Sequence, residues 1–235
     1  MKPAPWLILG GHGYVGAHLG RALRRAGDEV VAKGRADADL REGVDPGWIS
    51  AADAVVLATG PVRAPTEAAL RADNLRVAEQ VAQGYAAAAA RPPLFFLSSL
   101  HVYARSERPL ALDAPTEPPR SAYGAVKLAC EALLADAAAR HGYPLWIGRA
   151  GNLVAPEAPL NPASFVADMR AALRRDGCIV VPGDPRRDLV WIADLARGLA
   201  ARRRAGIAPG GVRLENACTG RPVALAAVAA AAVAA

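Results

Sequence analysis

The chain has 235 residues, of which 53% are hydrophobic and 21% charged. This length and balance suit a compact globular protein with one large core, and exclude a disordered chain or two full-sized domains. The net charge of +6 comes from arginines and lysines scattered without interleaved aromatic residues, so we expect an anionic small molecule as the partner and no nucleic acid.

The first predicted element is a strand over residues 6–9 that leads through a glycine turn into a helix. The run "WLIL" is apolar, glycines interrupt it, and helical spacing then continues as far as Gly27. One lysine and four apolar residues before the glycines are too few for a signal peptide or a membrane anchor. We therefore expect a protein of the cytoplasm with no membrane segment.

The glycine spacing predicts a dinucleotide site. Gly10, Gly13 and Gly16 follow G-x-x-G-x-x-G, and Gly11 with the last two satisfies G-x-G-x-x-G. Small residues let the backbone turn tightly and bring its N–H groups against a pyrophosphate, whose charge the helix N-terminus favours. The strand before and the helix after support this interpretation over a turn without a ligand.

A second strand is predicted over residues 28–34 and a third over 53–60. The end of the second strand indicates which dinucleotide binds, because NAD enzymes usually place a carboxylate there, whereas a 2′-phosphate needs a cation. Here Lys33 and Arg35 flank a glycine and no acid is present. We predict NADP, with NAD as the alternative; under the plainer interpretation Arg35 is a solvated surface arginine.

Two long helices and two apolar strands follow. The helices are predicted over 66–90 and 121–142, and the strands over 93–99 and 144–152. Strands without alternation, separated by helices, indicate a parallel sheet covered on both faces. The predicted fold is therefore a doubly wound α/β (Rossmann) fold.

The remaining sequence is Pro-rich with shorter elements, including a helix near 166–175 and an alanine-rich C-terminal helix. We divide the chain into a dinucleotide-binding domain (1–150, with 186–204 packing on it) and a small substrate lobe (151–185 and 205–235).

The three cysteines are Cys130, Cys178 and Cys218. Their odd number and wide spacing argue against a disulfide framework and against a zinc site, so we expect no metal and a reducing compartment.

Tyr123 and Lys127 are four residues apart on the second long helix and therefore share a face. An ammonium about 4 Å from a phenol at a partly buried dielectric stabilises the phenolate by a few kcal/mol. Tyr123 can then act as a general acid or base near neutral pH. Lysine suits this position because it is a compact donor that can bind ribose hydroxyls, whereas a guanidinium is bulky and always protonated. A surface tyrosine beside a helix lysine is the alternative.

Seven segments together resemble an extended short-chain dehydrogenase/reductase, the group that contains NAD(P)-dependent nucleotide-sugar epimerases, dehydratases and reductases. They run from Trp6 to about Leu225 and read "GGHGYVG", "DADLRE", "DAVVLATG", "FFLSSLHVYA", "YGAVK", "GRAGNLV" and "RRDLVWIADLA". No single segment is decisive, but their order and spacing are specific.

The resemblance implies roles for individual residues. Tyr123 is the catalytic acid/base, Lys127 its partner and a ribose ligand, and Ser99 a hydrogen-bonding partner of the reacting oxygen. The cofactor contacts implied by the motifs and the resemblance are Gly10, Gly11, Gly13, Tyr14, Val15, Gly16, Arg35, Asp39, Leu40, Ala58, Thr59, Gly60 and Lys127. The implied substrate contacts are His101, Asn152 and Arg187.

Several of these residues have plainer interpretations. Ser99 can simply end a strand, and Asp39 can cap a loop. Arg187 has planar donors that fit a diphosphate, but it can instead pair with Asp188. We expect His101 to line the pocket wall and not to shuttle protons.

The reaction type follows from the same comparison. Dehydratases of this group resemble one another in having an acidic pair after the catalytic serine or threonine, and here those positions are Leu100 and His101. That leaves a reductase of a keto group on a sugar nucleotide or related small substrate, or an epimerase that retains NAD(P). The predicted NADP preference favours the reductase. A non-catalytic NADP-binding sensor or scaffold is the alternative from another class.

Two expectations concern the whole molecule. The long helices at 66–90 and 123–141 occupy segments through which relatives commonly pair, so we expect a homodimer. Family members usually continue for many tens of residues beyond the region that "NACTGRPV" resembles. This predicts either an abbreviated substrate lobe, which suits a smaller substrate, or an incomplete chain.

Overall fold

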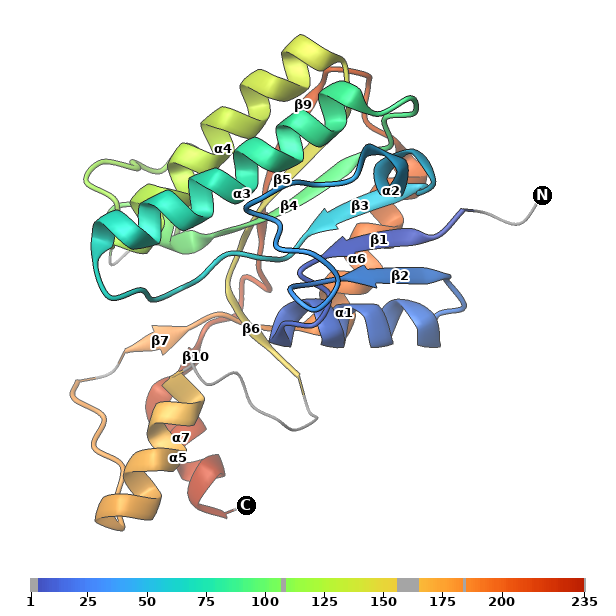
Figure 1. Ribbon diagram of the computed structural model, residues 1–235. Coiled ribbons are helices and arrows are strands. Elements are labelled where there is room, and N and C mark those ends of the chain that lie inside the picture. The colour runs from blue at the N-terminus through green and yellow to red at the C-terminus, as the bar shows by residue number, and fades with distance from the viewer. Residues whose placement is uncertain (1–3, 107–108, 156–164, 184, 235) are drawn as a thin grey trace.

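The computed structural model describes residues 4–106, 109–155, 165–183 and 185–234, and its centre is a six-stranded parallel sheet (Figure 1). The strand order is β2-β1-β3-β4-β5-β9. The strands are β1 (Trp6–Leu9), β2 (Val30–Lys33), β3 (Ala54–Leu57), β4 (Leu94–Ser99), β5 (Leu145–Ala150) and β9 (Val212–Ala217). The predicted doubly wound parallel sheet is confirmed.

Successive residues of a central strand belong to two different cores. In β1, Leu7 and Leu9 lie in one core, while Trp6 and Ile8 lie in the other. All four side chains are essentially buried. Side chains alternate between the faces of a strand, so a strand covered on both faces must be apolar at every position.

Helices cover the two faces of the sheet (Figure 1). The first face carries α2 (Pro46–Ser50), α3 (Glu67–Ala87) and α4 (Ala122–His141). The second face carries α1 (Tyr14–Arg25) and α6 (Ile192–Ala205), which contact each other. The two long predicted helices are confirmed, each with a side-chain cap at its start: Thr66 accepts from Ala69 N and Ser121 from Gly124 N.

The carboxyl ends of the parallel strands meet at one edge of the sheet. From β1 the chain first adds β2 on one side and then crosses to β3 on the other, so the direction of winding reverses beside β1. A crevice at the carboxyl ends of the strands, at such a switch point, is where doubly wound proteins bind ligands.

Two elements differ from the sequence analysis. The predicted lobe contained all of 205–235, but β9 pairs in parallel with β5 and extends the large sheet. Its side chains are exposed or half-buried because it is an edge strand, so it lacks an apolar run. The short helix α2 was not predicted; Asp45 caps it by accepting from Gly47 N, and Pro46 starts it.

A smaller region projects from the sheet (Figure 1). It contains α5 (Phe165–Asp176) and α7 (Leu225–Ala234), which contact each other, and β7 (Arg186–Arg187) paired antiparallel with β10 (Val223–Ala224). A parallel pair, β6 (Asn152–Val154) and β8 (Leu189–Trp191), lies between this region and the sheet. No residue of α5 is buried. Within the described ranges, no helix has both the length and the apolar character that a bilayer span requires.

Candidate active site

The glycine turn leaves the start of α1 open. Gly13 precedes the helix with no side-chain cap, and the first helical turn contains no acidic residue. A Cβ on Gly16 would collide with the carbonyl oxygen of Gly10, so the turn requires glycine there. The open backbone N–H groups and the positive helix end fit a pyrophosphate.

The side chains of Tyr14 and Val15 contact other parts of the protein. The Tyr14 hydroxyl accepts a hydrogen bond from Ala155 N at 2.9 Å, and burial raises the pKa of this phenol. Val15 packs against the core beneath α1. The two side chains thus brace the turn against the end of β6.

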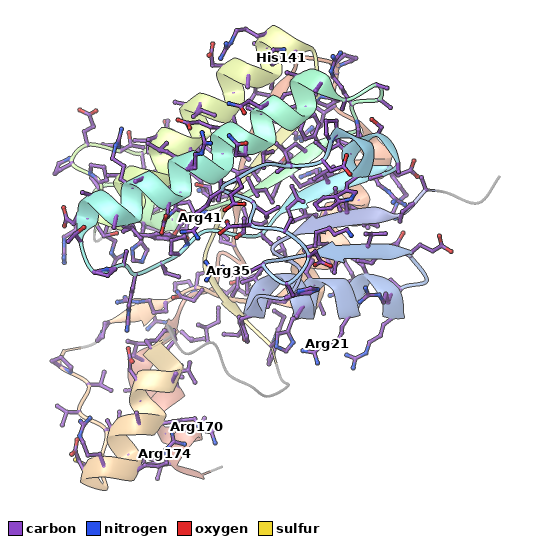
Figure 2. The ribbon with its side chains drawn as sticks, viewed as in Figure 1. Arg21, Arg35, Arg41, His141, Arg170 and Arg174 are labelled. Carbon is purple, nitrogen blue, oxygen red and sulfur yellow. The ribbon has the colours of Figure 1, made fainter. Side chains whose placement is uncertain are left out.

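The loop after β2 carries Arg35 and Asp37 close to the end of that strand. Arg35 is exposed and has no ion-pair partner among the described residues (Figure 2). Lys33 lies over the Trp48 ring at 4.5 Å. Asp37 folds back so that its Oδ2 accepts from Gly34 N at 2.9 Å, which places an acid near the end of β2 that the sequence did not indicate.

Asp39 and Leu40 follow in the same loop. The Asp39 carboxylate accepts from the Arg41 backbone N–H and from its guanidinium, and these bonds lower the pKa of the carboxyl. Arg41 also reaches Asp73 on α3 at 3.1 Å. Leu40 is buried in the core. Asp39 therefore caps the loop, which is the plainer of the two roles considered for it.

The loop after β3 contains the predicted Ala58, Thr59 and Gly60. The backbone at Gly60 has φ +128°, and a Cβ there would collide with Asn74 Oδ1. Asn74, on α3, is buried and donates to the carbonyls of Pro61 and Leu70. The sequence analysis missed Asn74, although one polar residue on an apolar helix face, four after Leu70, was a usable signal.

Lys127 is anchored in the protein interior beside Tyr123. It is 4% exposed, and its Nζ donates to the Leu97 carbonyl at 3.1 Å. The ammonium lies 5.7 Å from the centre of the Tyr123 ring. The Tyr123 hydroxyl has no hydrogen-bond partner among the described residues, so it is free to meet a substrate.

Ser99 and His101 lie at the 3₁₀ helix η1 (Leu100–Val102), which packs against α4. Ser99 ends β4, and its Oγ accepts from His101 N at 3.2 Å. The carbonyl of His101 packs so tightly against α4 at Gly124 that no Cβ could fit there. The His101 ring lies 6.3 Å from the Tyr123 ring. Partial burial lowers the pKa of His101, and repulsion from Arg120 and Arg187 lowers it further.

Asn152 and Arg187 differ in how they are bonded. The Asn152 side chain donates to the Asp188 carbonyl at 3.1 Å and so fixes β6 against β8. The Asp188 carboxylate accepts from Thr219 and from Gly220 N, not from Arg187. Arg187 bonds only to the Arg186 carbonyl among the described residues, which removes the proposed pairing with Asp188.

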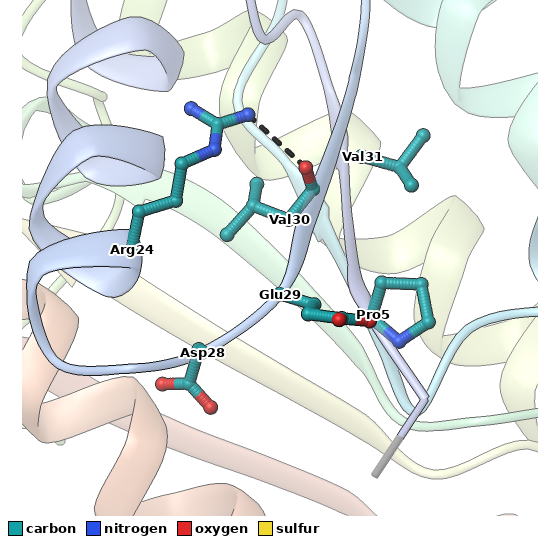
Figure 3. A pocket seen from close by; sticks show the side chains of 6 residues that line it. All are labelled: Pro5, Arg24, Asp28, Glu29, Val30 and Val31. Atoms are coloured by element: carbon teal, nitrogen blue, oxygen red, sulfur yellow. Dashed lines mark hydrogen bonds between the residues drawn. The ribbon is translucent and has the colours of Figure 1, made fainter. Parts of the chain in front are cut away.

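A separate hollow lies at the opposite edge of the sheet (Figure 3). Its lining includes Pro5, which precedes β1, and Asp28, Glu29 and Val30 at the start of β2. Arg24 closes one side by donating to the Val30 carbonyl at 3.0 Å. This hollow is remote from the carboxyl ends of the strands and takes no part in the site.

Known proteins resemble this chain in sequence over most of its length. The model of the "NAD dependent epimerase/dehydratase family" matches residues 6–210. A dTDP-4-dehydrorhamnose reductase of Streptomyces griseus is 33% identical over 229 residues, 90% of this chain and 71% of that protein.

Solved structures share the fold. A UDP-N-acetylglucosamine 4-epimerase from Methanobrevibacter ruminantium M1, in complex with UDP-N-acetylmuramic acid, superposes with a TM-score of 0.81 at 18% identity. MoeE5 in complex with UDP-glucuronic acid and NAD gives 0.80 at 23% identity. Each comparison covers 98% of this chain and 81% of the other.

Proposed function

The chain belongs to the NAD-dependent epimerase/dehydratase family, and we propose that it is an NADP-dependent reductase of a keto group on a sugar nucleotide or a related small substrate. The observation that carries this proposal is the anchored Lys127 ammonium beside the free Tyr123 hydroxyl. Lys127 lies near the loop after β3: a Cβ on Gly60 would come within 3.7 Å of Lys127 Nζ.

The dinucleotide would lie across the carboxyl ends of β1 and β3. The glycine turn and the start of α1 would hold its pyrophosphate, and the loop 58–60 would lie beside it. Lys127 would bind the ribose hydroxyls. A nicotinamide bound there would supply the hydride that reduces the substrate.

In this proposal the proton that the substrate oxygen gains comes from a residue of the protein. Tyr123 donates its hydroxyl proton to the substrate oxygen as the keto carbon becomes a carbinol carbon. The Lys127 ammonium stabilises the phenolate that remains. Ser99 donates a hydrogen bond to the same substrate oxygen, since its Oγ accepts from His101 N and its own proton is available.

Reduction is favoured over the other reactions of the family. The 33% identical relative is a reductase of dTDP-4-dehydrorhamnose. Leu100 and His101 follow Ser99, so the protein supplies no acidic pair for eliminating water. An epimerase that retains its cofactor is the second candidate, because a 4-epimerase shares the fold with a TM-score of 0.81.

The preference for NADP rests on the loop after β2. Arg35 is exposed without an ion-pair partner in the described part of the chain, so it can meet a 2′-phosphate. The carboxylate that feels the charge of Arg35, that of Asp39, already accepts hydrogen bonds from Arg41.

The test is oxidation of NADPH, with NADH as comparator, across a panel of keto sugar nucleotides that includes dTDP-4-dehydrorhamnose, and of simpler ketones. We expect turnover with NADPH and a loss of its advantage over NADH of about tenfold in Arg35→Ser, as for one charged hydrogen bond. Arg170→Ser is the matched control, because Arg170 is exposed on α5 (Figure 2). A preference of the unaltered enzyme for NADH would contradict the role of Arg35.

The other outcomes identify the alternatives. Interconversion of two sugar nucleotides without net NADPH oxidation would identify an epimerase. Binding of NADP by Tyr123→Phe protein, with no turnover by the unaltered protein on any substrate, would support the sensor.

A homodimer through α3 and α4 is also proposed, since these helices lie side by side on the first face of the sheet (Figure 1). Measurement of the mass in solution tests it.

A further inference from the structure

Glu131 is a buried carboxylate that the proposed reaction does not use. It lies on α4 four residues after Lys127, so the two side chains share one face of the helix, which packs against β4 and β5 (Figure 1). Lys127 is 4% exposed and Glu131 5%. Lys127 Nζ donates to the Leu97 carbonyl, and the hydroxyl of the next residue, Ser98, donates to Glu131. A buried cation and a buried carboxylate thus contact consecutive residues of one strand.

Arg149, on β5, binds both oxygens of this carboxylate. Its Nε donates to Glu131 Oε1 at 3.1 Å and to Oε2 at 3.2 Å, and its Nη2 donates to Oε2 at 2.7 Å. The Arg149 and Glu131 side chains are only 6% and 7% exposed. Among the described residues, no ion pair joins Glu131 to Lys127. The Arg149 guanidinium therefore binds the carboxylate that Lys127 would otherwise attract.

A carboxylate bound to Lys127 would cancel the positive charge on which the role of Tyr123 depends. Opposite charges four residues apart on a helix attract one another, and the attraction is stronger at a low dielectric than in water. The pair of Glu131 and Arg149 has no net charge, so it adds little potential at the Tyr123 hydroxyl. A lone carboxylate on the same helix face would oppose Lys127.

Other charged and titratable groups also face this part of α4. Burial raises the pKa of the Cys130 thiol, Lys127 and Arg71 of α3 lower it, and Glu131 raises it, so both signs of charge act on this face. The remaining groups near Tyr123 and Glu131 are His101 of η1, Arg120 just before α4 and Arg149 of β5. Glu131 is the one carboxylate in this set.

We propose that Arg149 is a positioning residue for the reaction: by binding both oxygens of Glu131, it keeps this carboxylate away from Lys127 and leaves the Lys127 charge to act on Tyr123. This inference rests on the proposed function and deepens it, because it assigns a buried ion pair to the preparation of the general acid. Arg149 acts through Lys127 and touches neither substrate nor cofactor.

The test measures the ionisation of Tyr123 without turnover. Phenolate absorbance is recorded as the pH rises, and subtracting the same protein with Tyr123→Phe isolates the titration of this hydroxyl. Arg149→Met strands a carboxylate and should raise the pH midpoint by about one unit; Glu131→Gln strands a cation and should lower it by a similar amount. Glu131→Leu combined with Arg149→Met removes both charges and should titrate as the native protein does.

The opposite directions distinguish an electrostatic role from a structural one. Both single variants lose the same ion pair, so loosened packing alone would move the two midpoints the same way. Arg140→Met is the matched control, because Arg140 pairs with Asp136 on the same helix but the two side chains are 64% and 66% exposed. Solvent screens that pair, so the midpoint should not move. If Arg149→Met fails to fold, Glu131→Gln and the double variant carry the test.

Midpoints that do not move, or that move in the same direction in the two single variants, would overturn the proposal. In NADPH oxidation, the alkaline loss of turnover should follow the absorbance midpoints. Opposite shifts in a protein that never oxidises NADPH would disprove the reductase and leave the role of Arg149. Turnover by the native protein with midpoints that are the same in every variant would disprove the role of Arg149 and leave the reductase.

Discussion

Tyr123 has a hydroxyl proton that can be transferred, and Lys127 beside it has a charge that is held in place. The ammonium is held by the Leu97 carbonyl and lies over the Phe96 ring at 4.7 Å, so its position is set by β4. The Tyr123 hydroxyl has no comparable restraint in the described part of the chain. A preorganised cation beside a free phenol costs little reorganisation when the proton moves.

Tyr123→Phe should lower turnover by about a hundredfold to ten-thousandfold, the range for a general acid or base. NADP⁺ affinity and the melting temperature should stay nearly unchanged, because no structural hydrogen bond of this hydroxyl is lost. Tyr143→Phe is the opposite control: its hydroxyl donates to the Leu134 carbonyl, so that change should cost about 1 kcal/mol of stability and spare turnover. Steady-state kinetics measure the turnover of the two variants, and urea unfolding measures their stability. Full turnover by Tyr123→Phe would refute the role of Tyr123 as the general acid or base.

His101 should make stability depend on pH. Its folded-state pKa is lowered, so below about pH 6.5 the unfolded chain binds a proton that the folded protein resists. Stability is therefore lost as the pH falls from there toward the folded pKa. The charged groups facing the ring are Arg120 and Arg187. Urea midpoints at pH 7.5 and 5.5 should differ less in His101→Gln than in the native protein, whereas His141→Gln at the end of α4 serves as control (Figure 2).

Some candidate site residues have a signal in the sequence and others do not. Tyr123 and Lys127 were predicted because a helix brings positions four apart onto one face. Arg120 has no such periodic signal, since burial and repulsion from Arg187, a residue of the distant strand β7, lower its pKa only in the folded protein. Asp37 was overlooked because its carboxylate returns to Gly34 only when the loop folds.

At the scale of elements, η1, which follows Ser99, packs against α4, the helix of Tyr123. Contact is close because Gly124 has no side chain where the His101 carbonyl approaches. Alanine there would force backbone apart, since a carbonyl cannot move as a flexible side chain can.

Gly124→Ala should therefore destabilise the protein by about 1–3 kcal/mol and reduce turnover. Gly198→Ala is the matched control, because Gly198 is also inside a helix but a Cβ there meets nothing within 4 Å. That change should stabilise the protein by about 1 kcal/mol through helix propensity alone. Thermal unfolding with parallel assays checks both, and equal behaviour of the two variants would show that η1 and α4 are not tightly packed there.

A buried ion pair joins α4 to β5. Arg149 Nη2 lies 2.7 Å from Glu131 Oε2, and the side chains are 6% and 7% exposed. The Ser98 hydroxyl also donates to this carboxylate, and the Arg149 guanidinium lies 4.8 Å from the Tyr103 ring centre. Removing one charge would leave the other buried alone.

Arg149→Met should accordingly cost about 3–5 kcal/mol, whereas Glu131→Leu combined with Arg149→Met should recover most of that loss. The comparison is made by urea unfolding of the two variants and the native protein. If the double variant were no more stable than Arg149→Met, the cost would come from packing and not from the stranded carboxylate.

Buried elements have a clear pattern in the sequence, and exposed elements do not. Strand β4 and the helices beside it were predicted because a doubly covered strand must be apolar and Ser121 and Gly142 mark the ends of α4. Strand β9 was not, because Arg213 and Glu215 stand on an edge where solvent permits charge. Its place in the sheet comes from tertiary pairing with β5.

Across the whole molecule, burial is concentrated around the large sheet. The two cores surround β1, β3, β4 and β5, whereas α5 buries no residue and Val233 of α7 is 60% exposed. Local stability follows buried apolar contact. The region formed by α5 and α7 should therefore open far more often than the sheet.

Limited trypsin digestion tests this difference. Arg170 and Arg174 on α5 should be cleaved at least about tenfold faster than Arg21 on α1, because no residue of α5 is buried. Arg170 and Arg174 are exposed on α5, whereas Arg21 is half-buried on α1 (Figure 2), and α1 is held by the buried Leu19 and Leu23. Mass spectrometry of the fragments over time gives the order of cleavage. Cleavage of α1 first would mean that the sheet and its covering helices are the less stable part, and that α5 and α7 are held by contacts stronger than their exposure indicates.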